Sequence, residues 1–347
     1  MKIPALFVFI LFCFASFFSP AAFAQEQQFA NLADFKLESG ETIHDCRIGY
    51  RIFGALNAAK SNAILIPTWA NGTTEQMKAS FATNPVVNGS EYFVIAMDAL
   101  SNGVSSSPSN SATQPRMKFP KVTVRDMVNS QHQVVTETLG LRHLRAVIGI
   151  SMGGMQTFEW MVAYPTFMDV AIPIVGSPRL APYDLLLWQT QIDAIVTNPA
   201  WNHGDYNENP SRLVEFELGA LLLTSPQQYN KDKTRQQVFE SLAEAKDAPT
   251  PDANNKIRQA EAMMALDVSK DFGGSMERAA AAVKAKVLVI VAKYDHVVTP
   301  QPARDFAALL HAPILELESD CGHSATGCEG EKVTAAVANF LQNGAAN

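Results

Sequence analysis

The strongest chemical signal in the chain is a serine between two glycines. Residues Gly149–Gly153 read Gly-Ile-Ser-Met-Gly, with Ser151 at the centre. The apolar run Leu144–Ile150 predicts a buried strand before it, and apolar residues at helical spacing predict a helix over Gln156–Tyr164. A strand, a tight Gly-x-Ser-x-Gly turn and a helix form a nucleophile elbow, which presents the serine hydroxyl above a sheet. We therefore predict that Ser151 is the nucleophile of an acyl reaction; the alternative is a structural Gly/Ser turn.

A serine hydroxyl is a weak nucleophile until a base accepts its proton. In chains with this elbow the acid and then the base follow the serine, each in a loop after a strand. His323 comes directly after the predicted strand Ile314–Leu317. The other histidines precede Ser151, fall in a helical region, adjoin the candidate acid or precede the last strand: His44, His132, His143, His203, His296 and His311. We therefore predict His323 as the base.

The acid of such a triad orients the imidazole and stabilises its charged form. Asp295 follows the predicted strand Val287–Val291, where this residue is expected. Asp320 is the leading substitute, and a role for Asp295 as a helix cap or turn residue is the alternative.

The negative oxygen of the tetrahedral intermediate needs two hydrogen-bond donors. One is expected to be the backbone N–H of Met152, the residue after the nucleophile. The other should come from Thr68–Gly72, the loop after the predicted strand Ala63–Pro67, and we select the N–H of Trp69.

The elements that must position these residues alternate between short apolar runs and helical segments, which predicts a mostly parallel central sheet flanked by helices. With the elbow, this pattern indicates the α/β-hydrolase fold. Residues 182–281 contain no convincing strand and are rich in Leu, Ala, Gln and Glu. We predict that residues 25–181 and 282–347 form the core and that residues 182–281 form an inserted helical lid.

The first 24 residues have the pattern of a secretory signal peptide. Lys2 supplies a positive start, Ala5–Phe18 is almost wholly apolar, and Ala22–Ala24 has the small-x-small pattern of a cleavage site. We therefore expect a periplasmic or secreted protein with no membrane segment after cleavage; a retained N-terminal anchor is the alternative.

Charge and cysteines restrict the partners further. Without Lys2, 26 basic and 34 acidic residues leave a formal charge of −8, which disfavours nucleic acid and anionic membranes. In an oxidising compartment Cys321 and Cys328 could form a disulfide, leaving Cys46 as a buried thiol. Metal ligation by Cys321, His323 and Cys328 is the alternative, but the set lacks a fourth ligand. We predict neither a cofactor nor a metal.

Several stretches resemble the homoserine O-acetyltransferase family of α/β-hydrolases. The most specific are the Ser-Met-Gly-Gly-Met elbow at Ser151–Met155 and the stretch Asn198–Tyr206, while Phe119–Val128 extends the resemblance. It covers most of the chain after the leader. It implies the same fold and places the family's triad on the serine, aspartate and histidine predicted above.

The chain departs from that family at two points. Thr68–Gly72 replaces the family's His-Ala-Leu-Thr-Gly run, and Ser324 follows the base where the family usually carries an aspartate for the homoserine amine. Export would also separate the enzyme from acetyl-CoA. We therefore predict hydrolysis of a small-molecule carboxylic ester, with acyl transfer and a non-catalytic binding protein as alternatives. The oligomeric state is not fixed by the sequence, and a homodimer stays open.

Overall fold

The computed structural model describes residues 26–83, 87, 91–211, 213–246 and 250–343. The predicted signal peptide, residues 1–24, lies outside the described residues. Within the described part of the chain, no helix has the length and apolar character needed to cross a membrane.

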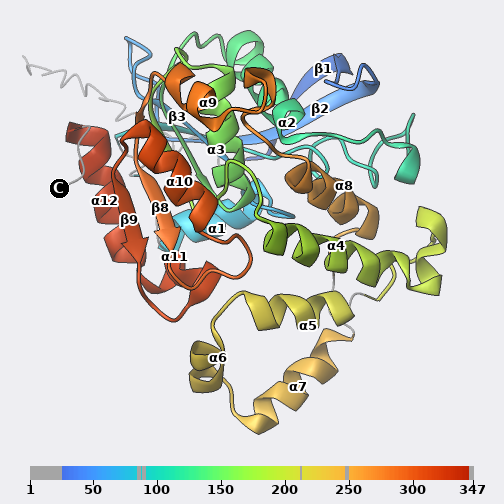
Figure 1. The fold of residues 1–347 in the computed structure, drawn as a ribbon. Coiled ribbons are helices and arrows are strands. Elements are labelled where there is room, and N and C mark those ends of the chain that lie inside the picture. The colour runs from blue at the N-terminus through green and yellow to red at the C-terminus, as the bar shows by residue number, and fades with distance from the viewer. Residues whose placement is uncertain (1–25, 84–86, 88–90, 212, 247–249, 344–347) are drawn as a thin grey trace, which may run out of the picture.

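One sheet forms the centre of the molecule (Figure 1). Its strands within the described residues are β1 (Gln28–Lys36), β2 (Thr42–Phe53), β3 (Ala63–Pro67), β4 (Phe93–Met97), β5 (Leu144–Ile150), β6 (Met168–Ile174), β7 (Lys286–Val287), β8 (Val289–Ala292) and β9 (Ile314–Leu317). Their spatial order is β1-β2-β4-β3-β5-β6-β8-β9, with the short β7 also paired to β6. β1 and β2 are antiparallel to their neighbours, and the pairs from β4 to β9 are parallel. The predicted α/β-hydrolase fold with a mostly parallel sheet is confirmed.

The central strands are apolar throughout because both faces of the sheet are covered. In β3, Ala63 and Leu65 pack into one hydrophobic cluster, whereas Ile64 and Ile66 pack into the other on the opposite face. The apolar residues of Phe35–Leu37 predict a strand at this point of the sequence, but β1 begins earlier, at Gln28. Its register against β2 shifts around Ala33, and this irregularity interrupts the alternation of apolar and polar residues by which a strand is recognised in a sequence.

Helices cover both faces (Figure 1). The described helices outside the predicted lid are α1 (Thr74–Thr83), α2 (Val124–Gln133, continued by a π-helical turn over Val134–Thr138), α3 (Met152–Ala163), α10 (Gln301–Leu310), α11 (Ala325–Cys328) and α12 (Gly330–Asn343). Side chains of α2, α3 and α10 pack into one cluster, and those of α1 and α12 into the other. The sheet is therefore the middle of three layers.

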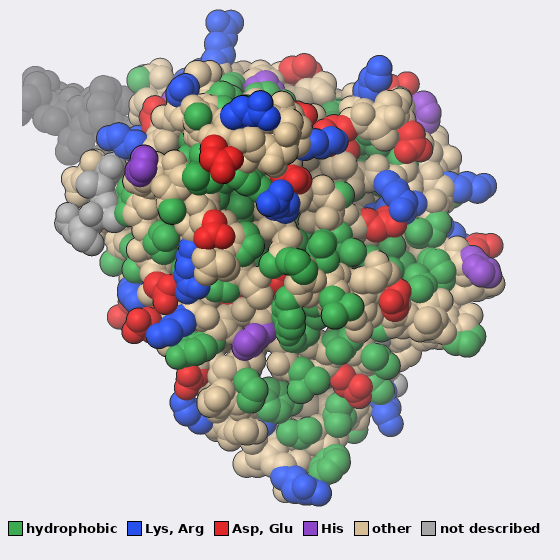
Figure 2. Space-filling view, in the orientation of Figure 1, with side chains coloured by type: hydrophobic (Ala, Val, Ile, Leu, Met, Phe, Trp, Pro, Cys, Tyr) green, Lys and Arg blue, Asp and Glu red, His purple; other side chains and the backbone are tan. Residues whose placement is uncertain are grey.

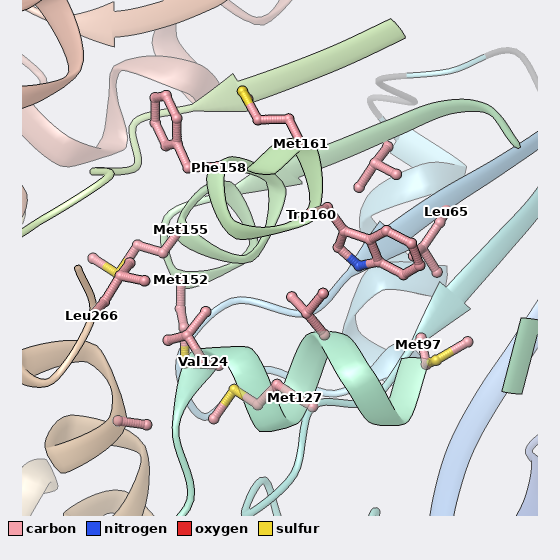
Figure 3. Close-up of a cluster of buried hydrophobic side chains, with 14 of the residues drawn as sticks. Leu65, Met97, Val124, Met127, Met152, Met155, Phe158, Trp160, Met161 and Leu266 are labelled. Carbon is pink, nitrogen blue, oxygen red and sulfur yellow. The ribbon is translucent and has the colours of Figure 1, made fainter. Parts of the chain in front are cut away.

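The first cluster is centred on α3 (Figure 3). Phe158 and Trp160 are fully buried and lie on this helix with Met155 and Met161. The Trp160 indole N–H donates to the side chain of Gln131 on α2 at 2.8 Å, so its one polar group is satisfied inside the core. This packing fixes the helix that begins directly after Ser151.

The residues predicted as a lid are helical. The described helices of this segment are α4 (Pro182–Val196), α5 (Leu213–Leu222), α6 (Pro226–Asp232), α7 (Arg235–Ala245), α8 (Ala253–Met264) and α9 (Met276–Ala282), with 3-10 segments at Pro199–Gly204 and Lys270–Phe272. α5, α6 and α7 form an arm away from the sheet (Figure 1). α9 instead packs against α10 and α3. The division of the chain at residues 181 and 282 stays a prediction.

Candidate active site

The turn between β5 and α3 has the geometry of a nucleophile elbow. Ser151 has φ 58° and ψ −121°, a left-handed conformation that non-glycine residues rarely adopt. Its N–H donates to the carbonyl of Ile174 at 2.9 Å, which anchors the turn to the neighbouring strand β6. A Cβ on Gly153 would lie 2.6 Å from the carbonyl oxygen of Pro67, so this position requires glycine. The turn is strained, and the contacts around it hold the serine in place.

The structure brings together the three residues predicted as a triad. His323 Nε2 lies 2.9 Å from Ser151 Oγ, and His323 Nδ1 lies 2.6 Å from Asp295 Oδ2. Because a carboxylate only accepts, Nδ1 carries a proton and Nε2 is free to accept the serine proton. Asp320, the alternative acid, instead forms an ion pair with Lys231. The arrangement can activate a serine for attack on an acyl carbon.

Asp295 is fixed by its own loop. The backbone N–H groups of Val297 and Val298 donate to Asp295 Oδ1 at 2.8 and 2.9 Å, which leaves Oδ2 for the imidazole. Burial lowers the pKa of His323, but the charge and hydrogen bond of Asp295, with a further contribution from Asp184, outweigh it and raise that pKa overall. The site therefore favours the imidazolium that forms when the serine loses its proton.

The loop that carries His323 is held on two sides. A disulfide joins Cys321, two residues before the histidine, to Cys328 in α11. From the inserted arm, the carbonyl of Leu223 accepts from Ser324 N–H at 3.2 Å, and Ser225 N–H donates to the carbonyl of Asp320 at 3.0 Å. The position of the base thus depends on the disulfide and on the connection between α5 and α6.

The predicted oxyanion donors lie next to the serine. Thr68–Gly72 is fixed by two glutamines: Gln156 donates to the carbonyl of Thr68 at 3.0 Å, and Gln259 accepts from Asn71 N–H at 2.6 Å. Trp69 lines the same cavity as Ser151. Among the described residues, neither the backbone N–H of Trp69 nor that of Met152 has a hydrogen-bond acceptor. Both backbone N–H groups are therefore without a partner in this part of the chain.

A cavity of about 510 Å³ opens onto Ser151 and His323. Its wall is mainly apolar, and helices α4, α5 and α8 supply much of it. The lining residues are Trp69, Ala70, Asn71, Ile150, Ser151, Trp188, Gln191, Gly219, Leu222, Leu223, Lys256, Val297, His323, Ser324, Thr326 and Gly327. On the outside, exposed hydrophobic side chains gather over α4 and α5 (Figure 2). No sequence motif identifies Trp188, Gln191 and Lys256 as cavity residues, because only the packing of the inserted helices brings them to the cavity.

The cysteines do not form a metal site. Cys321 and Cys328 are bonded to each other, and no cluster of three or more potential His, Cys, Asp or Glu ligands occurs in the described ranges. Cys46 is buried, and burial raises the pKa of its thiol to about 12, so it stays protonated near neutral pH.

Gly153→Ala tests whether the close approach of α3 to β3 positions the nucleophile. The added Cβ would have to move the Pro67 carbonyl or the elbow, so we expect kcat for ester turnover to fall by about 100-fold, a loss typical of misplaced catalytic groups. The measurement is kcat with melting temperature. Gly140→Ala is the control: the nearest atom to its Cβ lies 4.0 Å away, and the strain of its positive φ should lower the melting temperature without changing kcat. Full activity in Gly153→Ala would contradict the argument.

Known proteins share this fold and much of this sequence. A family model described as the alpha/beta hydrolase fold matches residues 64–326. The chain is 34% identical over 282 residues to an ethyl acetate hydrolase of Pseudomonas veronii, covering 78% of this chain and 80% of that protein. It is 27% identical over 353 residues to a homoserine O-acetyltransferase of Methanosalsum zhilinae, covering 89% and 71%.

A solved acetylester hydrolase from Corynebacterium glutamicum superposes with a TM-score of 0.85 at 27% identity, over 92% of this chain and 96% of that one. The predicted resemblance to homoserine O-acetyltransferases is confirmed, and the chain is also similar to esterases. The chain therefore belongs to the α/β-hydrolase fold family and is an enzyme of that family.

Proposed function

We propose that this enzyme is an exported serine esterase that hydrolyses small carboxylic esters through an acyl-enzyme on Ser151. The hydrogen-bonded chain from Ser151 through His323 to Asp295, facing an apolar cavity, carries the proposal. The relatives named ethyl acetate hydrolase and acetylester hydrolase favour a short acyl group such as acetyl.

The reaction follows from the geometry in two steps. Ser151 Oγ attacks the acyl carbon while His323 Nε2 accepts its proton, and Met152 and Trp69 N–H groups stabilise the oxyanion. The C–O bond to the alcohol then breaks, and His323 returns the proton to the departing oxygen. Water attacks the acyl-enzyme with the same base, releasing the acid and restoring the serine. Asp295 keeps the imidazole oriented in both steps.

Acyl transfer is the second candidate function, favoured by the homoserine O-acetyltransferase relatives. It differs only in the acceptor, since an alcohol or amine would replace water at the acyl-enzyme. Ser324, which lines the cavity beside the base, offers no charge to an ammonium group. This favours water over homoserine as the acceptor.

Ser151→Ala tests the nucleophile. With p-nitrophenyl esters from acetate to octanoate, we expect kcat/KM of the purified mature protein to be highest for the short chains and to fall by about 10⁴-fold or more in the variant. An added alcohol or amine that captures the acyl group in preference to water would indicate a transferase. Ser61→Ala, an exposed serine at the opposite end of β3, is the control. Unchanged activity in Ser151→Ala would overturn Ser151 as the nucleophile. No release from any ester by the wild type, together with no labelling by a fluorophosphonate, would favour the binding-protein alternative.

The disulfide provides an independent test of how the base is held. We expect reduction, or the double variant Cys321→Ser/Cys328→Ser, to lower kcat and to destabilise the His323 loop by about 2–3 kcal/mol, the entropy of closing so short a loop. The measurement is kcat and melting temperature with and without reductant, with the free thiols counted. Reductant should leave the double variant unchanged, because its Cys321–Cys328 disulfide is gone and Cys46 is already a free thiol. Unchanged activity with the bridge broken would contradict this role.

Export is proposed from the leader-like first 24 residues and is supported by the disulfide, because structural disulfides persist in oxidising compartments. Expressed in a bacterium with an outer membrane, the protein should accumulate in the periplasm or medium with Gln25 as its first residue. Intact mass and N-terminal sequencing measure this. Uncleaved protein confined to the cytoplasm, with free Cys321 and Cys328, would contradict export.

A further inference from the structure

A second buried carboxylate lies next to the proposed triad. Asp184, in the first turn of α4, has no exposed surface. Its Oδ1 accepts from the backbone N–H of Thr299 at 3.1 Å, and its Oδ2 accepts from the Thr299 hydroxyl at 3.0 Å and from Ala181 N–H at 3.2 Å. All three partners donate, which is the pattern that suits an ionised carboxylate. Burial raises the pKa of Asp184 above its ordinary value and the charge of Asp295 adds to that rise, whereas these three hydrogen bonds oppose it.

Asp184 and Asp295 hold the same short loop. Asp295 accepts from the N–H groups of Val297 and Val298, and Asp184 accepts from the next residue, Thr299. Three consecutive backbone N–H groups of this loop therefore donate to two buried carboxylates. The contact to Asp184 comes from another element 115 residues earlier in the chain. It connects the start of the insertion to the loop that carries the acid.

The same helix supplies part of the cavity wall. Trp188 and Gln191 lie four and seven residues after Asp184, on the same face of α4, and both line the cavity. Asp184 therefore fixes the wall of the cavity relative to the acid loop.

The charges around His323 show what Asp184 adds. Asp295 and Asp184 both favour the protonated imidazole, with Asp295 contributing more. Across the cavity, Lys256 on α8 is paired with Glu215 on α5, and beyond the histidine loop Lys231 is paired with Asp320. Each of these two cations is paired with an adjacent carboxylate, and the charges that raise the His323 pKa are those of Asp295 and Asp184.

We propose that Asp184 is a positioning residue of this active site: it fixes the Asp295 loop against α4 and adds a second negative charge that stabilises the His323 imidazolium. The proposal rests on the proposed function, because it assigns Asp184 a part in the charge that develops when Ser151 is acylated. It differs from a purely structural helix cap, which would affect stability alone.

Asp184→Asn removes the charge and keeps the side-chain shape. His323 must be neutral to accept the serine proton, so a raised histidine pKa places the acid limb of the kcat/KM profile at higher pH. Loss of the Asp184 charge should therefore move the acid limb to lower pH, and the shift should exceed the difference between replicate profiles. We also expect kcat to fall roughly 3- to 10-fold. The profile is measured with p-nitrophenyl acetate. Asp193→Asn, an exposed aspartate on the same helix, is the matched control and should leave the limb in place.

Thr299→Val separates the two parts of the role, since it keeps the charge and removes one hydrogen bond. It should lower kcat severalfold and leave the limb unchanged. The ¹⁵N shifts of the His323 ring, titrated in the wild type and in Asp184→Asn, report the charge effect without turnover. If the wild type were inactive on every ester, the proposed function would be wrong, and the ¹⁵N titration would still test the role of Asp184. The proposal is overturned if Asp184→Asn folds and neither the acid limb of its kcat/KM profile nor its His323 ¹⁵N titration moves. It is also overturned if Thr299→Val keeps the wild-type kcat, and that result can be obtained even if Asp184→Asn does not fold.

Discussion

The close contact between the start of α3 and the end of β3 is the constraint on which the site depends. Gly153 lies against the Pro67 carbonyl so closely that no side chain fits, and Ser151 takes a left-handed conformation beside it. That backbone costs on the order of 1–3 kcal/mol and persists only where its surroundings hold it. Here the buried packing of α3 provides that support, because Phe158 and Trp160 fix the helix against the sheet. The contact also brings Trp69, in the loop after β3, to the cavity that Ser151 lines.

The proposed acid and base are held in place differently from the proposed nucleophile. Asp295 and His323 lie in loops after β8 and β9, and such loops gain precision only from contacts made elsewhere. For Asp295 these are two backbone N–H groups and the neighbouring attachment of Thr299 to Asp184. For His323 they are the disulfide and the backbone hydrogen bonds to Leu223 and Ser225. Both loops are therefore attached to the inserted helices, so these helices contribute to the geometry of the triad as well as to the cavity.

In the proposed mechanism, the inserted helices also shape the cavity that an acceptor must enter to reach the acyl-enzyme. They make the cavity wall largely apolar, and the charged Lys256 that reaches it is paired with Glu215. A wall of this kind suits short apolar acyl and alkyl groups and offers no isolated charge to an ammonium or carboxylate. This agrees with an esterase more closely than with a transferase for a zwitterionic acceptor.

The sequence determined the elements that depend on local signals. Gly-x-Ser-x-Gly between an apolar strand and a helix identified Ser151, and the order of strands after it selected Asp295 and His323, which the structure brings into hydrogen-bond contact. It did not reveal the full length of β1, because the irregularity at Ala33 breaks the alternation. It also gave no indication of Asp184, Trp188 or Gln191. Their place at the site is set by how α4 packs after a long insertion, and no local pattern records a contact between residues 115 positions apart. Residue order along the strands thus predicted the three residues that lie in hydrogen-bond contact, whereas tertiary packing alone placed the cavity wall and the second carboxylate.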